Sequence, residues 1–349
     1  MKTYIRSASS VSPQYTFGDA GFLENIVEYT GTRLRVIEPD YKTFIDPKQI
    51  RRMSHIIKIG VAAGHDCLSK AKVTMPGAII TGTALGCIED TVTFLTRIIE
   101  MQEEMLPPTA FIQSTHNTVA AQIALMLKCH NYNNTFVHKG VSFENALIDS
   151  LMLLNEGEAD TVLVGGTDEM TDSSFTILTR LGLYKRKPVS NLALFAEESK
   201  GTIGGEGATF FLLSGKSSPD NLGEFNGLKT FYKPADNAAI EKQIVAFLAT
   251  HATQIDDIDL VITGKNGDTK NDVVYEQVEL FAGRPQGHYK HLCGEYATSS
   301  SFALWLAANC VKAENVPDIV AQENIQPKKV LIYNHYQNIY HSLMLISAC

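Results

Sequence analysis

Short runs of consecutive apolar residues alternate along this chain with segments in which apolar residues recur at helical spacing. Most of the runs are rich in β-branched residues and end at glycine, and they occupy residues 77–82, 161–166, 208–213, 260–264 and 330–333. A strand with one solvated face would alternate apolar and polar residues, so continuous runs predict strands buried on both faces. The chain is therefore expected to contain sheets that other elements cover on each side.

Three further segments predict helices. Apolar residues recur every three or four positions over residues 120–128, and a similar stripe runs from Phe143 to Leu154. Residues 299–310 are rich in small side chains, which is typical of a helix packed tightly inside a core. Strands and helices that alternate in this way predict an α/β fold with helices on both sides of the sheets.

Two stretches lack either periodicity and are expected to be loops. They are residues 185–207 and residues 214–226, and the second is rich in Ser, Pro, Asp, Asn and Gly. That composition is typical of a boundary, so we divide the chain into an N-terminal half, residues 1–214, and a C-terminal half, residues 215–349. The glycines of the first stretch lack the spacing of a phosphate-binding loop and are expected to form turns.

The composition excludes several classes of protein. The chain has 349 residues, a net charge of −8 and no basic stripe, so a nucleic acid is not an expected ligand. No apolar run is long enough to span a membrane, and the first residues lack the apolar region of a secretory signal. The six cysteines are scattered, which is typical of free thiols in the cytoplasm rather than of a metal site. We therefore expect a cytoplasmic protein without a metal or cofactor.

A series of motifs along the chain resembles, in order, those of the β-ketoacyl synthase (condensing enzyme) family. They are SVSP at 10–13, GTALGCIE at 82–89, NTVAAQIA at 117–124, GEADTVLVGGTDE at 157–169, GEGA at 205–208 and KHLCG at 290–294. The resemblance implies a thiolase-like fold, which is built from two similar halves and has five layers in the order αβαβα. It also implies a dimer.

Members of this family condense acyl groups with one cysteine and two histidines. The cysteine lies on a strand-to-helix turn, where the helix N-terminus lowers its pKa and makes it a nucleophile. The family's spacing puts Gly140 at the cysteine, Gly264 at the first histidine and Glu295 at the second. The family's glycine-rich C-terminal loop corresponds here to residues 336–340, which contain no glycine. The resemblance therefore implies a retained scaffold whose catalytic residues are absent.

Degenerate ketosynthases of this kind serve as chain-length factors in type II polyketide pathways, and similar pairs are found in aryl-polyene and flexirubin-type pathways. The resemblance thus implies a subunit that is inactive alone, pairs with an active ketosynthase and shapes its acyl tunnel in fatty-acid or polyketide biosynthesis. Its expected partners are that ketosynthase, an acyl carrier protein and the acyl chain. Two alternatives stay open: a homologue with altered acyltransferase or decarboxylase chemistry, and a stand-alone acyl-binding or scaffold homodimer.

Several side chains are candidates for the vacated site or the acyl tunnel, namely Phe136, His138, Lys139, Ser142, Phe143, Lys290, Cys293 and Tyr336. His138 and Lys139 are either a replacement catalytic pair or polar side chains that only fill the vacated site. Ser142 is either a nucleophile or a helix cap. Cys293 is either an acyl-transfer thiol or a small buried side chain. Glu295 is either a base or one partner of an ion pair with Lys139 or Lys290.

Overall fold

The apolar runs form buried strands, as their patterns predict. The computed structural model describes residues 2–18, 21–106, 108–196, 198–322 and 324–349. The strands are β3 (Ala78–Gly82), β5 (Thr161–Asp168), β7 (Gly207–Ser214), β9 (Leu260–Thr263) and β11 (Lys329–Tyr336). In β7, Phe210 and Leu212 pack on one side of the sheet while Phe211 and Leu213 pack on the other. Both faces of this strand are therefore buried, which explains its unbroken apolar sequence.

The strands repeat one topology twice along the chain. With β1 (Thr3–Val11), β4 (Tyr132–Phe136), β8 (Gly223–Tyr232), β10 (Gln286–His288) and β12 (Tyr340–Ser347), the order is β10-β9-β11-β12-β8-β1-β7-β5-β3-β4. We number the strands of each half in chain order and leave out the short β2 and β6. Read from its outer edge toward the middle of the sheet, each half then has the order third, second, fourth, fifth, first. The three outer strands of each half are parallel, and the two inner ones are antiparallel. The halves meet where β1 pairs with β8.

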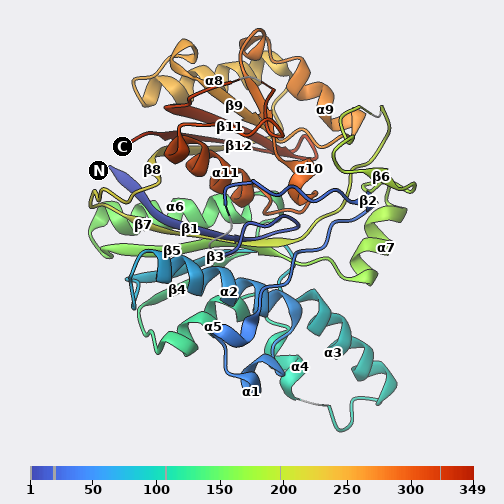
Figure 1. Ribbon diagram of the computed structural model, residues 1–349. Coiled ribbons are helices and arrows are strands. Elements are labelled where there is room, and N and C mark those ends of the chain that lie inside the picture. The colour runs from blue at the N-terminus through green and yellow to red at the C-terminus, as the bar shows by residue number, and fades with distance from the viewer. Residues whose placement is uncertain (1, 19–20, 107, 197, 323) are drawn as a thin grey trace.

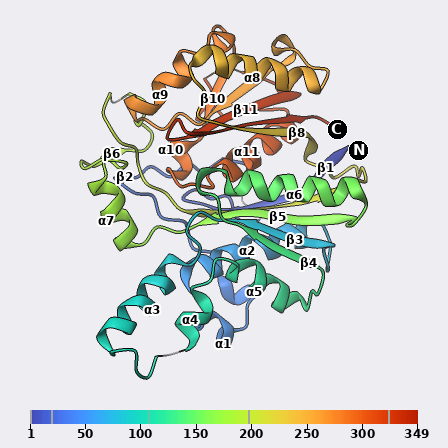
Figure 2. The ribbon, with the colours of Figure 1, turned by 180° about the vertical axis from the view of Figure 1, so that it is seen from behind.

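The helices complete five layers (Figures 1 and 2). Helices α6 (Ser142–Glu156) and α11 (Ser300–Ala313) lie between the two halves of the sheet. Helices α2 (His55–Lys70) and α5 (Thr118–Leu127) cover the outer face of the N-terminal half, and α8 (Asn237–Thr250) and α9 (Thr269–Glu276) cover that of the C-terminal half. This is the αβαβα arrangement that the family resemblance implies.

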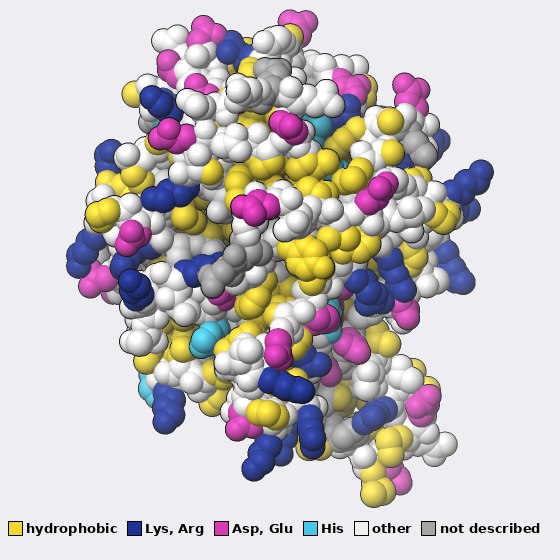
Figure 3. Space-filling view, viewed as in Figure 1, with side chains coloured by type: hydrophobic (Ala, Val, Ile, Leu, Met, Phe, Trp, Pro, Cys, Tyr) yellow, Lys and Arg dark blue, Asp and Glu magenta, His cyan; other side chains and the backbone are white. Residues whose placement is uncertain are grey.

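The remaining elements are short or peripheral. They are α1 (Pro47–Ile50), α3 (Ile88–Glu100), α4 (Pro108–Gln113), α7 (Asp172–Arg180), α10 (Lys290–Cys293), the ribbon of β2 (Thr30–Gly31) and β6 (Val189–Ser190), and the 3₁₀ turns η1 (Tyr41–Thr43), η2 (Lys139–Val141), η3 (Ile255–Asp257) and η4 (Glu279–Phe281). Helices α3 and α4 project from the N-terminal half, and the exposed side chains of Ile99 and Met105 lie in this projection. Figure 3 shows apolar side chains among charged ones on it. Within the described ranges, no helix has the length and hydropathy that crossing a bilayer requires.

The prediction of a loop over residues 214–226 was partly wrong, because β8 begins at Gly223. Residues such as Gly223, Glu224 and Asn226 have low strand propensity, but β8 is held between β12 and β1 by strand pairing. The chain turns between the two halves over 215–222, and the division at residue 214 stays a prediction.

A carboxyl group is buried in the middle layer. Glu144 of α6 is fully buried, and its Oε1 accepts a hydrogen bond of 2.9 Å from Ser342 Oγ of β12. Burial raises the pKa of Glu144 from 4.5 to about 7, because removing the carboxylate from water penalises its charged form. The native protein therefore holds a proton here that the unfolded chain has already released near neutral pH.

We expect Glu144→Gln to stabilise the protein at pH 8 but not at pH 4. Below pH 4.5 the carboxyl is protonated in both states and contributes nothing. Between 4.5 and about 7 only the unfolded state loses the proton, so native stability falls with rising pH. At about 1.4 kcal/mol per pKa unit, the free energy of unfolding gained by the variant approaches about 3 kcal/mol above pH 7. Urea unfolding at pH 4 and pH 8 measures the difference in the free energy of unfolding between the variant and the native protein.

Glu156→Gln is the matched control for this prediction, because Glu156 is exposed near the end of the same helix. It should leave the free energy of unfolding unchanged at both pH values. A Glu144→Gln variant whose stability relative to the native protein does not depend on pH would show that burial does not perturb this carboxyl.

Candidate functional site

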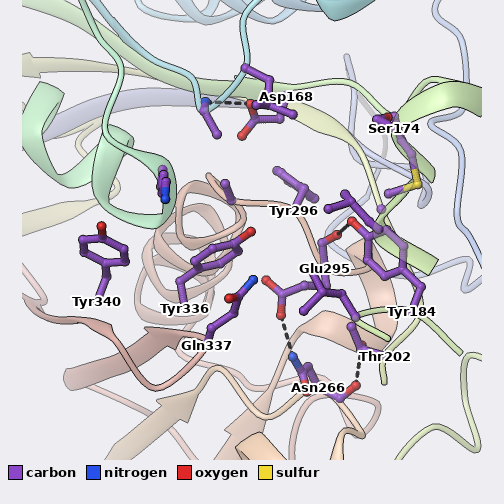
Figure 4. Close-up of a pocket in the computed structure, with 18 of the residues that line it drawn as sticks. Asp168, Ser174, Tyr184, Thr202, Asn266, Glu295, Tyr296, Tyr336, Gln337 and Tyr340 are labelled. Atoms are coloured by element: carbon purple, nitrogen blue, oxygen red, sulfur yellow. Dashed lines mark hydrogen bonds between the residues drawn. The ribbon is translucent and has the colours of Figure 1, made fainter. Parts of the chain in front are cut away.

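A cavity of about 490 Å³ opens where the two halves of the molecule meet (Figure 4). The N-terminal half contributes the end of β5, helix α7 and Lys139. The C-terminal half contributes Asn266, residues 295–297 and the hairpin between β11 and β12. In parallel α/β folds, the carboxyl ends of strands gather loops that carry function. The cavity is therefore the candidate functional site.

The strand-to-helix turn lies at the cavity, as the sequence predicts. Strand β4 ends at Phe136, η2 follows, and α6 begins at Ser142. Ser142 is buried, its Oγ accepts from the backbone N–H of His138 and donates to the carbonyl of Lys139, each at 2.8 Å. These bonds close the turn before α6 but do not cap the helix, because its N-cap residue is Val141 and no side chain accepts from the N–H groups of the first turn. The capping interpretation of Ser142 was therefore wrong.

At this turn, Lys139 rather than Gly140 is the residue that reaches the cavity. Lys139 has a left-handed φ of 48° and lines the cavity, whereas Gly140 is buried beneath it. A Cβ added to Gly140 would lie 2.2 Å from the Cβ of Tyr336. Tyr336 thus fills the space that a side chain at position 140 would need.

The loop expected to carry the first histidine is also filled. A Cβ on Gly264 would lie 2.2 Å from Asn334 Oδ1 and 2.5 Å from the Tyr275 hydroxyl. Asp272 shapes the loop by accepting the backbone N–H groups of Asn266 at 2.8 Å and Gly267 at 2.7 Å. Burial raises the pKa of Asp272 to about 6. Asn266 and Asn271 line the cavity, whereas Gly264 does not belong to its lining.

Glu295 reaches the cavity and belongs to an ion pair. Its Oε2 lies 2.6 Å from Lys290 Nζ and accepts another hydrogen bond of 2.6 Å from Asn266 Nδ2. Of the two lysines considered as partners, Lys290 forms the ion pair and is almost fully buried. A buried ammonium of this kind requires a counter-charge, so the pair also fixes the geometry of the loop.

The other candidate residues lie outside the cavity. Phe143 is fully buried and packs on Phe211, with ring centroids 5.8 Å apart, and Phe136 is half-buried against the same core. His138 is on the surface, with its ring 5.5 Å from that of Tyr340. Cys293 is fully buried, and burial raises the pKa of its thiol well above the ordinary value. The structure therefore brings Lys139, Glu295 and Tyr336 together, but not these four.

Several lining residues were missed by sequence reasoning. Tyr184, Tyr232, Tyr296 and Tyr340 come from separate segments, so no local pattern links them. Asp168 and Glu169 could have been predicted from the sequence, because they end the GGTDE motif at the carboxyl end of a buried strand.

These two acidic residues have different surroundings. Asp168 accepts hydrogen bonds from Thr83 Oγ1 (3.0 Å), Ala84 N (2.8 Å), Thr298 N (3.0 Å) and Thr298 Oγ1 (2.8 Å). Glu169 accepts one bond of 3.0 Å from the backbone N–H of Glu89, and burial raises its pKa to about 7. Over the part of the chain that the structure describes, no group of three or more His, Cys, Asp or Glu is placed to hold a metal ion.

Comparisons with known proteins agree on one family. Residues 36–200 match the family model "Beta-ketoacyl synthase, N-terminal domain". The 3-oxoacyl-[acyl-carrier-protein] synthase 2 of Synechocystis sp. is 21% identical over 184 residues, which are 50% of this chain and 44% of that protein. The match thus spans less than half the length of this curated relative.

Solved structures share the fold along the whole chain. The ishigamide ketosynthase/chain length factor has a TM-score of 0.77 and 16% identity, and a beta-ketoacyl synthase from Burkholderia phymatum has 0.80 and 14%. A type II polyketide synthase acyl-carrier protein in complex with its ketosynthase also gives 0.80 and 14%. Each match covers 100% of this chain and 99% of the other, which confirms the thiolase-like fold. Residues 36–200 thus resemble the N-terminal domain of the beta-ketoacyl synthases, and the entire chain has the fold of the solved ketosynthases.

Proposed function

We propose that this chain is a non-catalytic ketosynthase-like subunit, a chain-length factor, that pairs with an active β-ketoacyl-carrier-protein synthase and shapes its acyl tunnel. One observation carries the proposal. The described residues that line the cavity include neither a cysteine nor a histidine. Condensation through an acyl-enzyme needs a thiolate at this turn and groups that stabilise the developing negative charge.

The groups that replace the catalytic residues oppose that chemistry. Lys139 offers an amine on a flexible stem instead of a thiolate, and the thiol of Cys293 is buried away from the cavity. The carboxylate of Glu295 stands at the position that the resemblance assigns to the second histidine. A negative charge there would repel the carbanion that forms when a malonyl group loses carbon dioxide.

Pairing with another subunit is supported by an open sheet edge. Strand β4 stands at the end of the sheet order and pairs only with β3 among the described strands. Tyr132, the first residue of β4, and Val137, the residue after its last, are 45% and 46% exposed. An open edge is a template for another strand. Pairing β4 across a two-fold axis would create an obligate interface, on the order of 2,000 Å² or more.

Similar proteins provide further support by analogy. One structural neighbour is described as a ketosynthase/chain length factor, and another as an acyl-carrier protein in complex with its ketosynthase. In our proposal the active subunit carries out condensation on a carrier-bound chain. The loop after β4 lies beside the interface and limits the space into which that chain grows.

The purified protein should not condense acyl and malonyl carriers, because no thiolate is available at the turn. Product formation is measured by mass spectrometry of the carrier. Robust condensation by a sample free of other ketosynthases would overturn the proposal and favour altered chemistry in this chain.

Restoring a thiol should not restore condensation. Gly140→Cys is expected to lower the melting temperature, because its Cβ would overlap Tyr336, and overpacking of this kind costs about 1–3 kcal/mol. Lys139→Cys is the matched variant, since position 139 already holds an exposed side chain. It should fold and react with a thiol reagent but give no turnover, because the imidazoles are still absent. Turnover by either variant would show a less degraded site than we propose.

The loop after β4 should set product length in the complex. Phe143 was a candidate for the acyl tunnel, but it is buried against Phe211, so its substitution would act through stability. Val137 is exposed beside the open edge. Val137→Trp in the co-expressed pair should shorten the products while the partner's rate of acylation changes little. Chromatography with mass spectrometry gives the product profile.

Val245→Trp is the control, because Val245 is similarly exposed at 52% but lies on α8, in the outer layer of the other half. It should leave product length unchanged. If no ketosynthase co-purifies, or if neither substitution changes product length, a homodimeric acyl-binding role becomes the better account.

A further inference from the structure

The cavity contains a buried carboxylate oxygen that no described residue satisfies. Glu295 is 9% exposed, and both of its hydrogen-bond donors, Lys290 and Asn266, contact Oε2. Its Oε1 is buried and has no hydrogen-bond partner among the described residues. Figure 4 shows this carboxylate pointing toward the side chains of Tyr336 and Gln337, which also line the cavity. Buried acceptors of this kind are nearly always hydrogen-bonded, so Oε1 has the character of a ligand contact.

The charges around Glu295 select the kind of group that can approach it. Among the described lining residues, Lys139 is the cation, and its side chain is exposed at the turn. Lys290 is already paired with Glu295, and the oxygens of Asp168 are occupied by protein donors. An anion that contacts Glu295 Oε1 directly would meet repulsion from this carboxylate, whereas a hydrogen-bond donor would be stabilised.

The rest of the lining suits the apolar or aromatic part of a bound molecule. Leu178, Leu181 and Leu183 come from α7 and the residues after it, and the rings of Tyr184, Tyr336 and Tyr340 face the same space. At about 490 Å³ the cavity has the size of ordinary small-molecule sites, which are mostly apolar with a few placed polar groups.

We infer that this cavity binds a neutral, mainly apolar molecule that ends in a hydroxyl group, which donates a hydrogen bond to Glu295 Oε1, and that it rejects carboxylates. All residues involved belong to this chain. The inference therefore goes beyond the proposed function and holds whether or not the chain pairs with a ketosynthase.

Three matched probes test it by calorimetry with the purified chain: 4-butylphenol, 4-butylanisole and 4-butylbenzoate. The phenol offers the donor, the methyl ether removes it at nearly the same shape, and the benzoate replaces it with an anion. A hydrogen bond to a charged group predicts that the phenol binds at least about tenfold more tightly than the ether. The benzoate should bind more weakly than either.

Glu295→Gln removes the charge at nearly the same size. We expect the preference for phenol over benzoate to fall by about tenfold or more, because the repulsion is gone. Glu100→Gln makes the same change of charge at an exposed site on α3 and should leave the preference intact. Melting curves show whether Glu295→Gln folds, since it also leaves Lys290 without its counter-charge.

The probe series on the native protein decides the matter even if that variant does not fold. Equal affinity for the phenol and the ether, tighter binding of the benzoate, or no binding of any probe would overturn the inference. None of these results bears on whether a ketosynthase co-purifies, so the inference and the proposed function can fail separately.

Discussion

The cavity depends on a buried carboxylate that ties the two halves of the molecule together. Asp168 ends β5 in the N-terminal half, yet half of its hydrogen bonds come from Thr298, at the start of the central helix α11 of the other half. Burial raises the pKa of Asp168, while these donors lower it. A buried charge is tolerated only when it is fully hydrogen-bonded, so the bonds fix the distance between β5 and α11. The walls of the cavity are set by that distance.

At two positions that the family resemblance assigns to catalytic residues, neighbouring side chains occupy the space that a side chain would need. Tyr336 occupies the space next to Gly140, and Asn334 together with Tyr275 occupies the space next to Gly264. Of these three side chains, Tyr336 and Asn334 come from β11, and Tyr275 comes from α9. Because protein interiors are close-packed, a side chain can return to either position only if its neighbour moves. This filling of both positions is what the proposed non-catalytic role requires.

If Glu295 stands where the family resemblance implies a histidine, the electrostatic character of the site is reversed. A condensing enzyme offers donors to a developing negative charge, whereas Glu295 and its partner Lys290 present a fixed acceptor. In our proposals, the same carboxylate opposes malonyl chemistry and gives the cavity a preference for a neutral hydrogen-bond donor. The proposed function and the proposed binding preference thus have one physical origin.

The sequence by itself determined five buried strands and the helices α5, α6 and α11, because continuous apolar runs and helical stripes are local patterns that burial requires. It also determined that no thiol or imidazole stands at the expected catalytic positions, since absence of a residue type needs no structure. Only the tertiary structure decided that β8 forms from a loop-like sequence, that Lys139 rather than Gly140 faces the cavity, and that Phe143 belongs to the core. These features depend on strand pairing and on contacts between residues nearly 200 positions apart, such as Gly140 and Tyr336, and no local pattern encodes them.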